Sequence, residues 1–175
     1  MVAAKKEKKI EYKDELLSGQ DVIVIKFKGN DPFGKICKSI EGIVRQTLEI
    51  DAPKFFEKYI GWDLTDGTFK GRWEARKPGD RWTKMYISVW CWGEQSLKDK
   101  NGWMNLKINA TIDTKLWYHH SIQKSLWWTY AYAFYNRHRR KMWEEYRDYL
   151  FEVEERIREE LGISRKSPTQ AHAAG

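Results

Sequence analysis

The chain has 175 residues, of which 41% are hydrophobic and 33% are charged, so it is long enough to bury the core of one domain without disulfides or metals. Its net charge of +7 and isoelectric point near 9.3 favour a phosphate-rich or otherwise acidic partner. No apolar run approaches the roughly 18 residues of a membrane span, and the opening "MVAAKKEKK" lacks the apolar region of a signal peptide. We therefore expect a cytoplasmic protein that has no membrane partner.

Aromatic residues are more numerous than a core of this size requires. The sequence holds ten Trp, nine Tyr and seven Phe, so we expect some of the rings to serve an interface. The two cysteines, Cys37 and Cys91, lie on separate predicted elements and have no metal-ligand spacing around them. We expect both to be buried free thiols, as in a reducing cytoplasm.

The first predicted strand follows a charged N-terminal segment. Residues 1–19 are charged and poorly patterned, and "LLSGQ" ends them with a turn signal. Residues 22–28 then alternate, with Ile23, Ile25 and Phe27 on one side, which is typical of a strand.

One long helix and a shorter one are predicted next. Asp31 can cap the first helix, and Pro32 suits its first position because that N–H would be unpaired anyway. Apolar residues at helical spacing continue toward Ile50, where an Ala-Pro pair breaks the pattern. The stretch "PKFFEKYIG", residues 53–61, is predicted to be the second, shorter helix.

Period-two alternation then predicts an antiparallel sheet between Trp62 and Trp117. The stretches "TFKGRWEAR" and "RWTKMYISVWCW" flank the turn "KPGD", which predicts a hairpin. A polar loop leads to a long strand over residues 103–113, which places Met104 and Ile108 on one face. At least three antiparallel strands are expected.

The last part of the chain is predicted to be one long helix. Ser121 can act as its N-cap and Gly162 can end it, and no Pro or Gly interrupts the residues between them. The C-terminal half has a single apolar stripe, whereas residues 122–135 are apolar nearly all round. Such a segment needs more than one packing partner, so we expect the sheet to cover one side and another surface to cover the other.

This order of elements resembles the helix-grip architecture of the START and Bet v 1-like proteins over roughly residues 20–161. We therefore predict an α+β fold, in which an antiparallel sheet wraps on the long C-terminal helix and one or two helices follow the first strand. The predicted domain covers residues 20–162, between the charged segment 1–19 and a flexible tail, 163–175. The resemblance implies a hydrophobic ligand between sheet and helix, and in some members cyclisation or hydrolysis there.

Candidate catalytic groups are few. His119 and His120 follow the last strand, near Asp113 and Tyr118, and a histidine beside a carboxylate can act as a general base or a metal ligand. Adjacent histidines in a loop are more often solvated or capping, and the sequence supplies neither a third ligand at metal-binding spacing nor a placed nucleophile. We predict no catalytic residue, no metal and no cofactor, and the expectation leans against an enzyme.

The densest basic cluster is "NRHRRK", residues 136–141. On a helix its side chains fan around more than half of the circumference, so they cannot all be buried. They can contact phosphates, or they can form a solvated face that pairs with Glu144, Glu145 and Asp148 at helical spacing. The residues predicted to contact nucleic acid in this cluster are Arg137, Arg139, Arg140 and Lys141.

The stretch "RWTKMYISVWCWG", residues 81–93, sets an aliphatic face against an aromatic and cationic one. Met85, Ile87, Val89 and Cys91 alternate with larger rings and a lysine, and the long strand that follows has a similar mixture. The predicted aromatic face consists of Trp82, Tyr86, Trp90, Trp92, Trp103 and Trp117, together with the cations Lys84, Lys107 and Lys115.

This aromatic face has four open interpretations. Rings interleaved with cations can stack unpaired bases, or they can form a homodimer interface. With the sheet reversed, the same rings would line an internal ligand cavity under the long helix, or they would pack as an ordinary core.

The favoured prediction is a non-enzymatic basic protein that docks on RNA or on a ribonucleoprotein such as the ribosome, as a homodimer. A two-subunit form could bridge two copies of its target, as ribosome-silencing factors do. The alternative is a helix-grip protein that binds a hydrophobic small molecule in a cavity between the sheet and the long helix. That alternative accounts for the order of elements and the rings, but it leaves the positive charge incidental.

Overall fold

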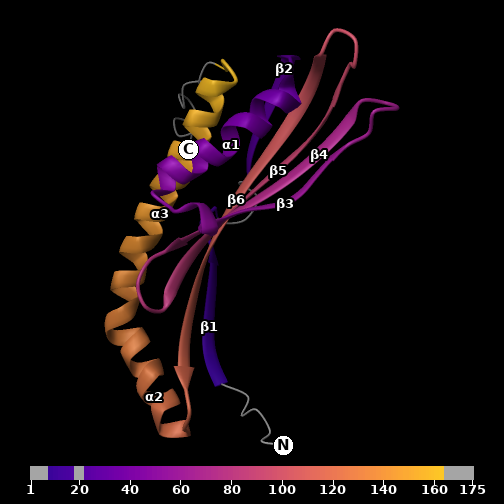
Figure 1. Ribbon diagram of the computed structural model, residues 1–175. Coiled ribbons are helices and arrows are strands. Elements are labelled where there is room, and N and C mark those ends of the chain that lie inside the picture. Colours follow the sequence, from indigo (N-terminus) through magenta and orange to yellow (C-terminus); the bar gives the residue numbers. More distant parts are fainter. Residues whose placement is uncertain (1–7, 18–21, 164–175) are drawn as a thin grey trace, which may run out of the picture.

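The computed structural model describes residues 8–17 and 22–163, which form one antiparallel sheet with its helices on a single side (Figure 1). None of the described elements covers the opposite, free side of the sheet. The elements are β1 (Lys8–Glu15), β2 (Ile23–Asn30), α1 (Pro32–Leu48), the 3₁₀ helix η1 (Ala52–Lys54), β3 (Phe55–Trp62), β4 (Thr68–Pro78), β5 (Thr83–Gln95), β6 (Asn101–Tyr118), α2 (Ser121–Tyr130), the π-helical turn η2 (Ala131–Tyr135) and α3 (Asn136–Glu160).

Strand β6 runs the length of the sheet and pairs with three other strands. Strand β5 lies along one edge of it. Strands β1 and β2 share the other edge, with Lys9 opposite Trp117 and Val24 opposite Lys107. Strands β4 and β3 complete the order β1-β6-β5-β4-β3. The free side is therefore one continuous surface to which every strand contributes.

The aliphatic side of the sheet faces the helices. In β5, Met85, Ile87, Val89 and Cys91 are at most 2% exposed, whereas Trp90 on the opposite side is 42% exposed. Burial of aliphatic area stabilises the fold by about 25 cal/mol per Å², which explains why this side and not the aromatic one meets the helices. The reversed sheet and the packed aromatic core are both contradicted, because the exposed rings of β5 point away from the long helix.

Helix α1 begins at Pro32 as predicted, but Asp31 does not cap it with its side chain. Asp31 has a left-handed φ of 49°, and its carboxylate accepts a hydrogen bond from the side-chain amide of Gln95 at 3.1 Å. The amide oxygen of Gln95 in turn accepts the backbone N–H of Phe33 at 3.1 Å. The end of β5 therefore satisfies the first turn of α1 and ties the helix to the sheet.

The predicted long helix is continuous through α2, η2 and α3. It ends at Gly162, which has a φ of 67°, and the N–H of Ile163 donates to the Arg158 carbonyl at 2.8 Å. At its start, His120 rather than Ser121 occupies the N-cap position, without a side-chain cap. The stripe predicted for the C-terminal half is buried, namely Tyr146, Leu150, Val153, Ile157 and Leu161.

Tyr135 of η2 fastens the long helix to the hairpin between β4 and β5. Its hydroxyl donates to the Asp80 carboxylate at 2.7 Å and lies 2.5 Å from the Thr83 hydroxyl. Thr83 also contacts the Thr114 hydroxyl at 2.9 Å. Burial raises the pKa of the Tyr135 hydroxyl well above its usual value, so this group remains a hydrogen-bond donor at neutral pH.

Two elements differ from the sequence-based prediction. Residues 53–61 are not a helix: after η1, Phe55 to Trp62 pair along β4, because their aromatic and β-branched side chains suit a half-exposed edge strand. Strand β1 lies in the charged segment for which no strand is predicted. Its Ile10 and Tyr12 turn toward the helices, while the charged residues between them face solvent.

The fold is of the α+β class, and its six-stranded antiparallel sheet with a long C-terminal helix fits a helix-grip-like order. Across residues 8–17 and 22–163, no helix combines the length and apolar character needed to cross a membrane. The predicted tail, residues 163–175, lies outside the described residues except for Ile163.

Candidate nucleic-acid interface

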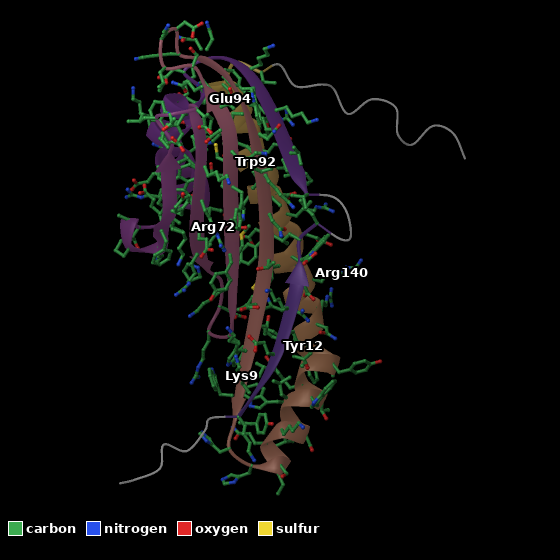
Figure 2. The ribbon with its side chains drawn as sticks, turned by 90° about the vertical axis from the view of Figure 1, so that its right-hand side faces the viewer. Lys9, Tyr12, Arg72, Trp92, Glu94 and Arg140 are labelled. Carbon is green, nitrogen blue, oxygen red and sulfur yellow. The ribbon has the colours of Figure 1, made fainter. Side chains whose placement is uncertain are left out.

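Tryptophans and cations lie in neighbouring rows on the free side of the sheet. In one row, Lys107 of β6, Trp90 of β5 and Arg72 of β4 are opposite one another. In the next row, Trp92 is opposite Lys70. We call this surface the aromatic platform, and it consists of Tyr59, Lys70, Arg72, Trp90, Trp92, Trp103 and Lys107. Figure 2 looks onto this side of the sheet and labels Arg72 and Trp92.

The three indole rings of the platform are open to solvent. Trp90 is 42% exposed, Trp92 37% and Trp103 41%. A sheet face that meets water is normally polar, and apolar area left in water forgoes about 25 cal/mol per Å² of stabilisation. Contact with the flat apolar surface of a partner would recover that free energy.

Arg72 and Trp90 form an ordered cation–ring pair. The guanidinium carbon of Arg72 lies 4.2 Å from the centre of the Trp90 ring, where the electron-rich face of the indole attracts a cation. An ion pair of 2.5 Å with Glu74 fixes the direction of the guanidinium. The platform therefore holds a planar cation and a planar ring in place before any partner arrives.

An apolar hollow of about 410 Å³ opens in the platform. Tyr59 of β3 and the pair Trp90 and Trp92 of β5 line it from either side of β4, and Lys70 and Arg72 of β4 line it as well. A hollow of this volume lies in the range of small-ligand sites. Its flat rings and two cations match the flat base and the charged phosphate of a nucleotide.

A second hollow, of about 360 Å³, adjoins it on the same side and is polar. Tyr86 and Ser88 of β5 and Asn109 and Thr111 of β6 line it, beside the carboxylates of Glu74 and Asp113. The four uncharged side chains supply both hydrogen-bond donors and acceptors. Arg72 lines both hollows. An extended partner could therefore pass from rings to polar groups without leaving the sheet.

The cations predicted for this face differ in how free they are. Lys107 belongs to the platform, and Lys84 is exposed opposite Asp113. Lys115 is different, because its ammonium lies 3.1 Å from Asp113 and 3.3 Å from Glu11. Hydrogen bonds to Asp113 and to Glu11 raise the pKa of Lys115. Two carboxylates thus offset the charge of Lys115, whereas Arg72 shares its one carboxylate, Glu74, with Lys58. We therefore assign Lys115 no role in attracting phosphate.

Two of the predicted rings lie on the free side but outside the platform. Tyr86 is in the polar hollow, with the Arg76 guanidinium 5.2 Å from its ring centre. Trp117 is 45% exposed at the far end of β6, opposite Lys9 of β1. The free side is therefore aromatic at both ends and polar between them.

Trp82 does not join the other rings of the predicted face. The Asp80 carboxylate accepts the backbone N–H groups of Trp82 and Thr83 at 2.8 and 2.7 Å, so the chain turns just before β5 and leaves the alternating pattern. The Trp82 ring then packs edge-on against Trp127 and Tyr135 of the long helix, with centroid distances of 5.4 and 5.5 Å. Its role is to hold the helix, not to meet a partner.

The basic cluster of the long helix is divided. Arg139 is largely buried: its guanidinium is bonded to the Asp14 carboxylate and lies 5.0 Å from the centre of the Tyr12 ring. Arg140 has an 83% exposed side chain and only a 3.8 Å contact with Glu144. Figure 2 shows Arg140 beyond the β1 edge, away from Trp92. The exposed members are Arg137, Arg140 and Lys141, and they form a surface separate from the platform.

Several platform residues were absent from the predicted site. Tyr59 lies in the segment read as a helix, so its position in a strand was hidden. Lys70 and Arg72 lie on the same face of the sheet as Trp90 and Trp92 and directly opposite them in the predicted hairpin. Pairing the two strands of the hairpin residue by residue would have found them. Lys28, opposite Trp103 on β2, extends the positive charge to the sheet edge.

The described residues offer little for catalysis. His119 and His120 are exposed in the turn before α2, and no group of three metal-binding side chains occurs among residues 8–17 and 22–163. Cys91 is buried and Cys37 is partly buried. Burial raises the pKa of the Cys37 thiol to about 11 and that of Cys91 further still, so neither forms a nucleophilic thiolate at neutral pH.

Comparisons with known proteins give no functional name. No family model and no curated protein matches the chain. Among solved structures, a protein of unknown function from Staphylococcus aureus is similar, with 10% identity, a TM-score of 0.26 and coverage of 90% of this chain and 93% of that one. An uncharacterised protein from Rhizobium leguminosarum shares 10% identity at a TM-score of 0.23, with 83% of this chain and 99% of that one covered.

Proposed function

We propose that the protein is a non-enzymatic binding module that holds unpaired RNA on the aromatic platform, alone or as part of a ribonucleoprotein such as the ribosome. The observation that carries this proposal is the apolar hollow between Tyr59, Trp90 and Trp92, with Lys70 and Arg72 lining it. Exposed rings on a sheet, alternating with cations, combine the two interactions that an unpaired nucleotide offers.

The bases would stack on the rings, and the cations would meet the backbone. Stacking on Trp90, Trp92 or Trp103 stabilises binding by about 1–3 kcal/mol per base and tolerates any base, because each base has a flat face. Lys107 and Lys70 would displace counterions from the phosphates, so binding should weaken as salt rises. The polar hollow would give hydrogen bonds to base edges and to the 2′-hydroxyl.

Unpaired strands fit this surface better than duplexes do. In a duplex, each base is already stacked on its neighbours and presents only its edge, so rings that lie on a sheet have no face to stack on. Duplex RNA is instead recognised by its shape, through contacts to phosphates and 2′-hydroxyls across the minor groove. Those contacts make no use of the exposed ring faces of the platform.

The alternative, a hydrophobic ligand between sheet and helix, has less support from the packing. The side chains between the two layers fill the space, since several of them are 0% exposed, namely Ile25, Ile36, Ile108, Val153 and Ile157. The hollows described above open on the free side of the sheet instead. We therefore propose the outer surface of the sheet as the binding site.

The test is fluorescence anisotropy with a labelled single-stranded RNA of about 12 nucleotides. Trp92→Ala should weaken binding about 5- to 100-fold, the equivalent of one lost stack. Trp128→Ala is the matched control, because Trp128 is 53% exposed but packs edge-on against Tyr12 on the helix side. Equal affinities for the wild type and Trp92→Ala, or no binding by the wild type, would refute the proposal.

A further inference from the structure

The outward side of α2 and η2 is a large exposed apolar surface. Ile122 is 77% exposed, Leu126 65%, Trp128 53%, Tyr132 81% and Phe134 70%. We call these five side chains the outer helix face. A monomer rarely leaves so many large apolar side chains together in water without a binding role.

Apart from Trp128, whose ring meets Tyr12 of β1 edge-on at 6.3 Å between centroids, the fold itself does not use these side chains. The inward side of the same segment is already anchored, since the Trp127 indole N–H donates to the Trp117 carbonyl at 2.9 Å. Ala131 and Tyr135 are buried on the sheet side, and Tyr130 packs against Trp82 at 6.2 Å between centroids. The outer helix face is therefore additional to the contacts that hold the helix in place.

The composition of the segment is that of an interface centre with a charged rim. From Ser125 to Asn136 the helix has no charged residue, whereas Lys124 and Arg137 stand at its two ends. Interfaces between protein subunits are depleted of charge at their centre, enriched in Trp, Tyr and Phe, and polar around the edge. Between Lys124 and Arg137, a charged partner would find no complementary group on this face.

The exposed area is close to what a stable dimer requires. A large apolar or aromatic side chain has about 150–250 Å² of surface, so five of them exposed by 53–81% present on the order of 600 Å². A standard interface buries about 800 Å² on each partner. The rim and neighbouring side chains can supply the remainder.

We propose that the outer helix face pairs with the same face of a second copy, as a two-fold symmetric homodimer. Self-pairing is the commonest form of assembly, and it requires only that one patch be complementary to itself, which an uncharged apolar surface satisfies. The helices lie on the side of the sheet opposite the platform (Figure 1), so both platforms stay open. That the dimer presents two RNA sites at once rests on the proposed function; the dimer itself does not.

The test is sedimentation velocity across a dilution from about 100 µM, above the micromolar dissociation constants that weak interfaces of this size show. The wild type should sediment as twice the chain mass of 21.0 kDa. Leu126→Glu should raise the dimer dissociation constant about 30-fold or more. Leu64→Glu is the matched control, with 67% exposure at a distant turn, and it should sediment as the wild type does.

Four results would overturn the inference. The first is a wild type that is monomeric at every concentration, and the second is a dimer that persists in Leu126→Glu. The third is a dimer that Trp92→Glu dissociates and Leu126→Glu does not. The fourth is a monomeric wild type that binds anionic lipid vesicles and loses that binding in Leu126→Glu. RNA anisotropy on the same samples separates the two proposals. A wild type that dimerises but does not bind RNA refutes only the platform. A wild type that stays monomeric but binds RNA refutes only the dimer.

Discussion

The Arg72 guanidinium lies 4.2 Å from the centre of the Trp90 ring, and the two residues are directly opposed on β4 and β5. The pair couples a fixed positive charge to an exposed ring at the edge of the apolar hollow. A guanidinium plane can itself stack on a base while it attracts the phosphate. Arg72 is therefore expected to act through both its charge and its shape.

Substitutions of Arg72 can separate these two contributions. Arg72→Lys keeps the charge but loses the plane, so it should weaken RNA binding while the salt dependence stays as in the wild type. Arg72→Ala should weaken binding and also reduce the slope of log K against log salt by about 0.7, the value for one phosphate on a single strand. Anisotropy titrations between about 50 and 200 mM salt measure both quantities. If both variants bind as the wild type does, Arg72 has no part in the site.

The exposed cations of the long helix should help the protein to dock on a ribonucleoprotein. The double variant Arg137→Glu and Arg140→Glu should lose most co-sedimentation with ribosomes at low salt, because it reverses two free charges. Lys38→Glu with Lys98→Glu makes the same change in net charge at other exposed positions and should co-sediment nearly as the wild type does. Equal losses in both double variants would mean that only net charge matters.

Two glycines should respond in opposite directions to alanine. A Cβ added at Gly93, beneath the platform, would overlap the Trp103 carbonyl oxygen and lie 2.9 Å from the Met104 Cα. Because these are backbone atoms, Gly93→Ala should lower the free energy of unfolding by about 2 kcal/mol or more. Gly42 lies in α1 with nothing within 4 Å of the added Cβ, so Gly42→Ala should raise it by about 0.5–1 kcal/mol. Urea unfolding measures both changes, and changes of the same sign would contradict the packing described for β5 and β6.

The partly buried thiol of Cys37 and the buried thiol of Cys91 predict a loss of stability at alkaline pH. Burial raises the pKa of Cys37 from 9.0 to about 11, so between these values the unfolded chain has released a proton that the folded chain retains. The free energy of unfolding should therefore fall as pH rises above about 9, by at most about 1.4 kcal/mol per pH unit for one thiol. Cys37→Ala should make that decline shallower in urea unfolding between about pH 8 and 10. An unchanged slope in this variant would show that Cys37 does not contribute.

The alternation of β5 was enough to predict which rings share a face, but not that this face is the exposed one. Period two places Trp90 and Trp92 together whatever else the chain does, and the buried positions between them are aliphatic. Trp82 departs from the alternation because its backbone N–H donates to the Asp80 carboxylate, which bends the chain at the start of the strand. Local hydrogen bonds of that kind have no periodic signal in the sequence.

Other parts of the site depended on contacts between distant residues. Arg139 looks like its neighbours in the basic cluster, but its partner Asp14 lies 125 positions away, on a strand that the sequence did not reveal. The short segment around Tyr59 fits both the helical period and the strand period, and a helix is predicted there. Only its pairing along the edge of β4 decides in favour of a strand. Sequence patterns thus predicted the layers and grouped the rings on one face of the sheet, while tertiary packing decided which face is buried and which cations remain free.

The most direct test of the platform is photo-crosslinking of the wild type to a single-stranded RNA that contains photoreactive thiouridine, followed by mass spectrometry of the peptides. The platform predicts crosslinks on β3, β4 and β5, at or beside Tyr59, Trp90 and Trp92, and their loss when unlabelled RNA competes. Crosslinks confined to α2 and α3, with none on the free side of the sheet, would contradict it.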